Sequence, residues 1–168
     1  GVVGTGAIGS RVAELCHLFG CEIAAYDLFP KKNAPEYLHY GTLEEVLSKS
    51  DIVTLHCPLT EDSRNLINQD RIAQMKKGAI LINAARGPIV DSKALADALN
   101  SGYLRGAGVD VFEMEPPLPM DHPLLHSINT IVTPHIAFAS DESMEIRAKI
   151  VFENIQKWMN KEQVNTIL

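Results

Sequence analysis

The feature that most constrains the fold of this chain is an alternation of short apolar runs with longer stretches of helical period. Apolar, often β-branched runs that are typical of buried strands occur at residues 21–26, 51–56, 78–83, 104–111 and 129–133. Stretches of helical period occur at residues 7–19, 43–49, 69–75, 91–101 and 141–159. Apolar strands separated by helices predict a parallel sheet that is covered on each side. We therefore expect an α/β fold with a doubly wound parallel sheet.

The ends of the predicted helices carry residues that commonly start or stop helices. Asp91 and Asp141 stand where N-caps belong, since a carboxylate accepts hydrogen bonds from the first amide groups of a helix. Gly20 and Gly102 follow the last turns of two helices, where glycine is favoured. These residues support the helix boundaries.

Composition limits the class of protein and its partners. The 168 residues are 46% hydrophobic and 21% charged, which suits a single globular domain. The net charge is −6 and neither sign forms a long run, so nucleic acid and anionic membranes are poor partners. No apolar stretch approaches the roughly 20 residues of a membrane span. The three cysteines lack CxxC spacing, which favours reduced thiols in the cytoplasm and gives no metal site. We expect a cytoplasmic protein with a small-molecule partner.

The first residues form a glycine-rich motif at a strand-to-helix turn. Gly4-Thr5-Gly6-Ala7-Ile8-Gly9 follows Val2 and Val3 and leads directly into the first helical stretch. In such a motif the first glycine permits the tight turn, the second lets a pyrophosphate approach the backbone, and the third lets helix and strand pack closely. The helix N-terminus then presents N–H groups to the phosphates. The alternative is a glycine-rich turn without a ligand.

An acidic residue at the end of the next strand favours the dinucleotide interpretation. Asp27 directly follows the apolar run at 21–26, where a carboxylate would accept hydrogen bonds from ribose hydroxyls. A carboxylate at this place repels a 2′-phosphate, so we expect NAD rather than NADP as cofactor.

Polar residues that could act in a reaction follow three later strands. Arg86, Glu115 and His135 come after the runs at 78–83, 104–111 and 129–133. Ligands of open α/β sheets bind at the carboxyl ends of the strands, so these side chains should share one site. A guanidinium grips a carboxylate, an imidazole exchanges a proton near neutral pH, and a nearby carboxylate favours the charged imidazole. This set suits the reduction of a 2-keto acid.

Each of these residues also has a structural interpretation. Arg86 could be a surface cation and His135 a capping or core-edge residue. Glu115 could be a solvated acid in the Pro-rich segment 115–123, although long loops in compact domains are often functional. Their occurrence at three successive strand ends favours chemistry.

Five segments resemble the nucleotide-binding domain of the D-2-hydroxyacid dehydrogenase family (D-isomer specific 2-hydroxyacid dehydrogenases). They are GTGAIG (4–9), HCPLTEDSRNLIN (56–68), KKGAILINAARGPIVDSKALADAL (76–99), GAGVDVFEMEPP (106–117) and TPHIAFAS (133–140). The resemblance covers nearly the whole chain and implies a Rossmann-type NAD-binding domain over residues 1–168. It also implies an oxidoreductase that transfers a hydride between NAD(H) and C2 of a small D-2-hydroxy acid or 2-keto acid.

The resemblance assigns roles to the matching positions. Arg86 would orient the substrate carboxylate and carbonyl, His135 would be the general acid and base, and Glu115 would pair with His135. Glu113 is a competing glutamate, but Glu115, directly before Pro116, matches the family motif. Cofactor contacts would come from the glycine-rich motif and the strand ends, namely Gly4, Gly6, Ala7, Ile8, Gly9, Asp27, Cys57, Pro58, Ser63, Ala84, Arg86, Asp110 and His135.

The resemblance also implies what lies outside this chain. The family's substrate-binding domain, built mostly from the first half of its members, is absent, so we expect Gly1 to begin inside the first strand of a nucleotide-binding domain that has been cut from a longer protein. The isolated piece should therefore bind NAD but turn over little. The segment at 135–140 is closest to the glycerate/hydroxypyruvate reductase-like and D-lactate dehydrogenase-like branches, whereas a glutamine replaces Glu115 in the formate-specific branch.

Two further expectations come from the family. Its nucleotide-binding domains commonly pair, so we expect a homodimer, with Leu95, Leu99, Tyr103 and Leu118 as candidate surface residues. Leu95 and Leu99 are four residues apart and could instead face the parent sheet. Some relatives are NAD-responsive corepressors that keep the same Arg, Glu and His, so the alternative function is an NAD-sensing module without turnover.

Overall fold

The computed structural model describes residues 1–114 and 117–166, and it divides the chain into two compact units, Gly1–His135 and Ile136–Leu168. The first unit contains a sheet of seven strands: β1 (Val2–Val3), β2 (Ile23–Tyr26), β3 (Leu38–Tyr40), β4 (Ile52–Leu55), β5 (Ile80–Asn83), β6 (Gly106–Val109) and β7 (Thr130–Val132). Its helices are α1 (Ala7–Leu18), α2 (Leu43–Lys49), α3 (Gln69–Gln74) and α4 (Ser92–Asn100), with short 3₁₀ helices η1 (Gly87–Ile89) and η2 (Pro123–Leu125).

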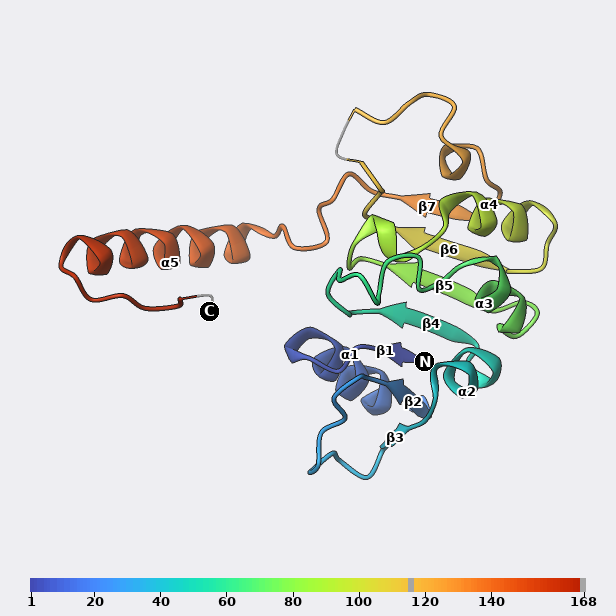
Figure 1. Cartoon of the computed structure of the whole chain (residues 1–168), viewed down its shortest axis with the longest axis horizontal. Coiled ribbons are helices and arrows are strands. Elements are labelled where there is room, and N and C mark those ends of the chain that lie inside the picture. The colour runs from blue at the N-terminus through green and yellow to red at the C-terminus, as the bar shows by residue number, and fades with distance from the viewer. Residues whose placement is uncertain (115–116, 167–168) are drawn as a thin grey trace. The chain divides into compact units, whose positions relative to one another are not determined.

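All strand pairs in the sheet are parallel, and the strand order is β3-β2-β1-β4-β5-β6-β7 (Figure 1). The chain builds outward from β1 in one direction, then returns to place β4 on the other side of β1. This order confirms the predicted Rossmann-type doubly wound sheet. The switch point between β1 and β4 is where such sheets bind ligands, at the carboxyl ends of the strands.

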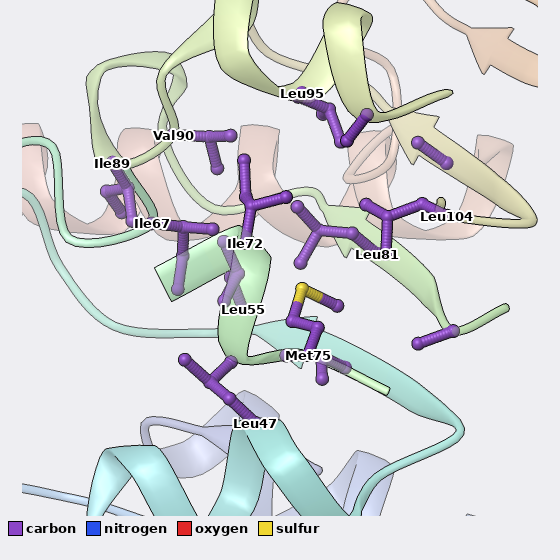
Figure 2. Close-up of a cluster of buried hydrophobic side chains, with 14 of the residues drawn as sticks. Leu47, Leu55, Ile67, Ile72, Met75, Leu81, Ile89, Val90, Leu95 and Leu104 are labelled. Carbon is purple, nitrogen blue, oxygen red and sulfur yellow. The ribbon is translucent and has the colours of Figure 1, made fainter. Parts of the chain in front are cut away.

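The larger part of the core fills the face of the sheet that α2, α3 and α4 cover. Val3, Val53, Leu55 and Leu81 point into it from the strands and are almost fully buried. Figure 2 shows Leu47, Ile72, Met75 and Leu95 from the three helices and their ends converging on Leu55 and Leu81. Leu95 and Leu99 are completely buried here, so they do not form a dimer surface and instead face the parent sheet.

The opposite face of the sheet is covered by α1 over β1 and β2. Val2 and Ala25 lie in register on this face and are buried against Ala13 of α1. Residues in register with them on the neighbouring strands include Thr54, Ile82 and, on β7, Ile131, whose side chain is 73% exposed. We predicted a sheet with helices on both faces. Within the first unit, helices cover both faces only over β1 and β2.

The helix ends agree with most of the sequence expectations. Asp91 caps α4 by accepting a hydrogen bond from Ala94 N–H at 2.9 Å, and Gly20 and Gly102 take positive φ values of 87° and 73° after their helices. The second unit holds α5 (Asp141–Met159), whose N-cap is Ser140 and not Asp141 as expected. The shorter Ser140 side chain reaches Ser143 N–H, while Asp141 lies in the first turn, where a carboxylate favours the helix dipole.

Strand β3 has three residues and was not expected from the sequence. Strand β1, expected at Val2 and Val3, has two residues. No helix within the described ranges, 1–114 and 117–166, is long and apolar enough to cross a membrane.

Candidate dinucleotide and substrate site

The glycine-rich turn between β1 and α1 has a backbone that side chains would disrupt. Gly4 adopts φ +92°, and a Cβ on it would lie 2.6 Å from Cys57 N at the end of β4. A Cβ on Gly9 would lie 1.9 Å from Gly4 O. Glycine at these two positions therefore lets the turn lie directly against the end of β4 and lets α1 pack close to β1, as the motif predicts.

The start of α1 is open where a phosphate would bind. Nothing lies within 4 Å of the position that a Cβ on Gly6 would occupy. Gly6 is the N-cap of α1 and supplies no side-chain cap, and Gly6, Ala7 and Ile8 are all exposed. The first-turn N–H groups and the positive end of the helix dipole therefore face an open cradle, which fits the pyrophosphate of a dinucleotide.

Asp27 is held in place at the end of β2 by Thr5 of the glycine-rich turn. Its Oδ2 accepts hydrogen bonds from Thr5 N–H at 2.6 Å and from Thr5 Oγ1 at 2.9 Å, and its Oδ1 accepts one from Phe29 N–H at 2.8 Å. Burial by itself would raise the pKa of Asp27, but these hydrogen bonds and the Lys31 cation lower it overall. Asp27 is thus ionised and oriented near neutral pH.

Sequence reasoning missed two residues that support Asp27. Thr5 lies between the first two glycines, and its hydroxyl also bonds to the Tyr40 hydroxyl at 2.8 Å. Tyr40 ends the unexpected strand β3, which pairs with β2. The position of Thr5 in the motif could have indicated its role, because a hydroxyl there can reach a carboxylate at the end of β2. Nothing in the sequence indicated the role of Tyr40, since β3 itself was not predicted.

The expected cofactor residues that follow β4 and β5 differ in how far their side chains are exposed. Cys57 is half-buried, and burial raises the pKa of its thiol. Pro58 is exposed, as is Ala84 at the end of β5. Ser63 is buried and donates a 2.7 Å hydrogen bond to Pro58 O, so its side chain stabilises the loop in this structure.

A cavity of about 500 Å³ lies at the carboxyl ends of β5, β6 and β7. Arg86, Asp110 and His135 line it together, each from the end of a different strand. Apolar side chains form much of the remaining wall, including those of Leu59, Met114, Leu118 and Leu125. The structure thus brings together three of the residues that the sequence singled out.

The backbone beneath the cavity is tied together by buried polar groups. Asn83 is almost fully buried; its Nδ2 donates to Arg86 O at 3.0 Å, and its backbone carbonyl accepts Asp110 N–H at 3.0 Å. Thr133, another residue that sequence reasoning missed, donates a short hydrogen bond from its hydroxyl to Asp110 Oδ1. These contacts link the ends of β5, β6 and β7, while Arg86 remains exposed.

His135 has an uncommon backbone conformation. Its φ of +57° lies in the left-handed region, which few residues other than glycine and asparagine adopt. Such conformations cost about 1–3 kcal/mol and cluster at functional sites. The observation supports a functional interpretation of His135 over a core-edge one.

Two glutamates follow β6 in the sequence, and the structure describes one of them. Glu115 lies outside the described residues. Glu113 accepts hydrogen bonds from Ser92 Oγ at 2.9 Å and from His122 Nε2 at 3.3 Å, so its carboxylate is engaged with two neighbouring elements. Within the described ranges, no group of three or more His, Cys, Asp or Glu side chains could hold a metal ion.

Comparison with known proteins agrees with this geometry. Residues 1–137 match the family described as D-isomer specific 2-hydroxyacid dehydrogenase, NAD binding domain. The chain is 44% identical over 157 residues to a glyoxylate reductase of Korarchaeum cryptofilum, covering 92% of this chain and 47% of that protein. It is 38% identical over 168 residues to a hydroxypyruvate reductase of Blautia hydrogenotrophica, covering 99% and 52%.

Solved structures show the same likeness. The D-lactate dehydrogenase of Aquifex aeolicus, complexed with NAD and lactic acid, superposes with a TM-score of 0.88 at 35% identity, covering 95% of this chain and 53% of that one. This chain therefore belongs to the D-isomer specific 2-hydroxyacid dehydrogenase family and corresponds to its NAD-binding domain over residues 1–137. It spans about half the length of the curated relatives that it matches.

Proposed function

We propose that the whole protein is an NAD-dependent D-2-hydroxyacid dehydrogenase, which interconverts a small D-2-hydroxy acid and the corresponding 2-keto acid. The observation that carries this proposal is the convergence of Arg86, Asp110 and His135 on one cavity. The cavity lies at the same edge of the sheet as the glycine-rich turn and Asp27, because all seven strands are parallel.

The residues at the start of α1 and the end of β2 would hold NAD. Gly6, Ala7 and Ile8 would receive the pyrophosphate, and Asp27 would accept hydrogen bonds from the adenosine ribose. Asp110, with Ala84 and Arg86, would meet the nicotinamide side. When bound as NADH, this cofactor supplies a hydride to the substrate's carbonyl carbon.

Arg86 and His135 would manage the charge and the proton of the substrate. The Arg86 guanidinium would bind the substrate carboxylate with two hydrogen bonds and fix the orientation of the carbonyl. As the carbonyl carbon gains the hydride, its C=O π bond breaks and the oxygen takes a proton from the His135 imidazolium. In the reverse direction, neutral His135 removes the hydroxyl proton, so reduction should be favoured at lower pH and oxidation at higher pH.

Glu115 would favour the charged form of His135. Its place in the motif supports this role, and the engagement of Glu113 by Ser92 and His122 leaves Glu115 as the better candidate. In the whole protein, Glu115→Gln should shift the pH profile of keto-acid reduction to lower pH, since the imidazolium loses its stabilising carboxylate. An unchanged profile would remove Glu115 from this role.

The remaining features of the whole protein follow from the same proposal. The substrate pocket would be completed by a substrate-binding domain outside these residues, and relatives named glyoxylate reductase, hydroxypyruvate reductase and D-lactate dehydrogenase support a small 2-keto acid as substrate. The protein would work in the cytoplasm as a homodimer. Tyr103 and Leu118 are half-buried and remain candidates for the dimer surface.

The test is NADH oxidation by the whole protein with a panel of 2-keto acids, including glyoxylate, hydroxypyruvate, pyruvate and an aromatic 2-keto acid, with NADPH in parallel. We expect turnover with at least one acid and a clear preference for NADH. Tight NADH binding without turnover on any acid would instead favour an NAD-sensing module.

A further inference from the structure

The loop that follows β6 packs directly on the backbone that carries Arg86. A Cβ on Gly87, the first residue of η1, would lie 1.9 Å from both C and O of Phe112 and 2.5 Å from Glu113 N. The backbone of residues 112–113 therefore lies directly on the segment that begins at Arg86. Any shift of this loop would be transmitted to the substrate-binding arginine, because no space separates the two backbones.

A hydrogen-bonded set of side chains anchors the same loop from the other side. Glu113 Oε2 accepts from Ser92 Oγ at 2.9 Å and lies 3.3 Å from His122 Nε2. Ser92 begins α4, and His122 is the N-cap of η2. One carboxylate oxygen thus joins the loop after β6 to two other elements.

The environment of His122 determines which ring nitrogen carries its proton. His122 is only 6% exposed, and its Nδ1 accepts a hydrogen bond from Leu124 N–H at 3.3 Å. The proton of the neutral ring is therefore assigned to Nε2, which donates to Glu113. An edge-on contact with the Phe112 ring, with centroids 5.2 Å apart and planes at 88°, fixes the plane of the imidazole.

We propose that Ser92, His122 and Glu113 form a positioning network for catalysis, which fixes the backbone of residues 112–113 against the segment of Arg86 so that Arg86 reaches the substrate in the correct geometry. The inference rests on the function proposed above. Glu113 acts through the position of Arg86, and it does not itself exchange protons with the substrate.

Two substitutions of His122 separate its two hydrogen bonds. His122→Gln keeps a donor near the position of Nε2 and loses the acceptor for Leu124 N–H, whereas His122→Asn keeps an acceptor near Nδ1 and loses the donor to Glu113. The network predicts that His122→Asn lowers kcat for keto-acid reduction about tenfold and raises KM for the keto acid, since misplaced substrate-binding groups affect both. His122→Gln should recover most of that loss.

Other readouts distinguish positioning from a general loss of structure. The NADH affinity of His122→Asn should stay close to that of the wild type, because the cradle at α1 and Asp27 lie outside the network and Arg86 supplies only one of the proposed cofactor contacts. Its pH profile should also keep its position, unlike that of Glu115→Gln. Ser92→Ala should act in the same direction as His122→Asn, and His39→Asn, a change at an exposed position on β3, is the matched control.

The decisive measurement is amide hydrogen exchange over residues 112–114 in the whole protein, which does not depend on turnover. We expect faster exchange in His122→Asn than in wild type or His122→Gln, together with the ordering of kcat given above. Equal exchange in all three, or equal kcat for His122→Asn and wild type, would overturn the network. If no 2-keto acid is turned over, the proposed function fails, while the exchange result still decides whether these side chains fix the loop.

Discussion

At the scale of single residues, we propose that Asp27 determines the preference for NAD over NADP. Its carboxylate is ionised and fixed by Thr5, so it cannot turn away from a 2′-phosphate without breaking two hydrogen bonds. Asp27→Ala should narrow the preference for NADH over NADPH by about one to two orders of magnitude, since like-charge repulsion at contact distance costs a few kcal/mol. Titration of cofactor fluorescence checks this, with Asp51→Ala at an exposed position as the control. An unchanged preference in Asp27→Ala would contradict the assignment.

His56, at the end of β4, should make stability depend on pH. Burial lowers its pKa from the ordinary value of 6.5, and its Nε2 lies 2.9 Å from Thr54 Oγ1. Because the folded pKa is below the unfolded one, the stabilisation is fully present above pH 6.5 and is lost as the pH falls from 6.5 through the folded pKa.

Replacing His56 by glutamine should therefore flatten the loss of stability on acidification. The amide can still bond to Thr54 but takes up no proton in this range. Thermal unfolding of the wild type, His56→Gln and the exposed control His39→Gln should be compared between about pH 7.5 and 5. Equal pH dependence in wild type and His56→Gln would show that His56 does not contribute.

At the scale of elements, the β1–α1 turn contains two glycines with different roles: we expect Gly6 to bind the cofactor and Gly4 to be required by the fold. Gly6 has φ −63° and open space where a Cβ would lie, so Gly6→Ala should fold with nearly unchanged stability. Its Cβ would occupy the path of the pyrophosphate, and NADH affinity should fall about tenfold or more. Gly4→Ala is the contrasting variant, because φ +92° and the 2.6 Å approach to Cys57 N should destabilise the fold itself. Wild-type NADH affinity in a folded Gly6→Ala protein would disprove the cradle.

The elements also show what could be predicted from sequence alone. Helix α2 has the bounds that its pattern predicts, since its apolar residues face the core and Thr42 and Glu45 form a capping box. Strand β3 was missed because three residues are too few to show a period, and one of them, His39, is exposed. The cap of α5 was misplaced by one residue, because serine and aspartate are both good caps and only the side-chain geometry decides.

The candidate site was predictable where one residue acts through its place at a strand end. Arg86 and His135 closely follow apolar runs that are typical of strands, so parallel topology alone brings them to one edge of the sheet. Thr5, Tyr40 and Thr133 act through contacts between strands, and their partners depend on the register of the sheet. That register is set by long-range packing and cannot be read from one local pattern.

At the scale of the whole molecule, we expect this chain to keep the NADH affinity of the whole protein but to lose most of its turnover of keto acids. The residues proposed to hold NAD lie within the 168 residues of this chain, so its NADH affinity should be comparable to that of the whole protein. Turnover should be lower by about three orders of magnitude, because hydride transfer needs a closed, dry cleft and a keto acid held in line with the nicotinamide. Parallel titrations and rate measurements on both proteins check this. Comparable turnover would show that the pocket is complete within these residues.

The proposed reaction is hydride transfer from NADH to a keto acid, with His135 as the proton donor. The most direct measurement uses NADH labelled with deuterium at the transferred nicotinamide C4 position, the whole protein, and the best keto acid of the panel. We expect a D-2-hydroxy acid with deuterium at C2, and a rate that His135→Ala reduces by about 10²–10⁴-fold with NADH affinity unchanged. A product without deuterium at C2, or a His135→Ala protein with the wild-type rate, would contradict it.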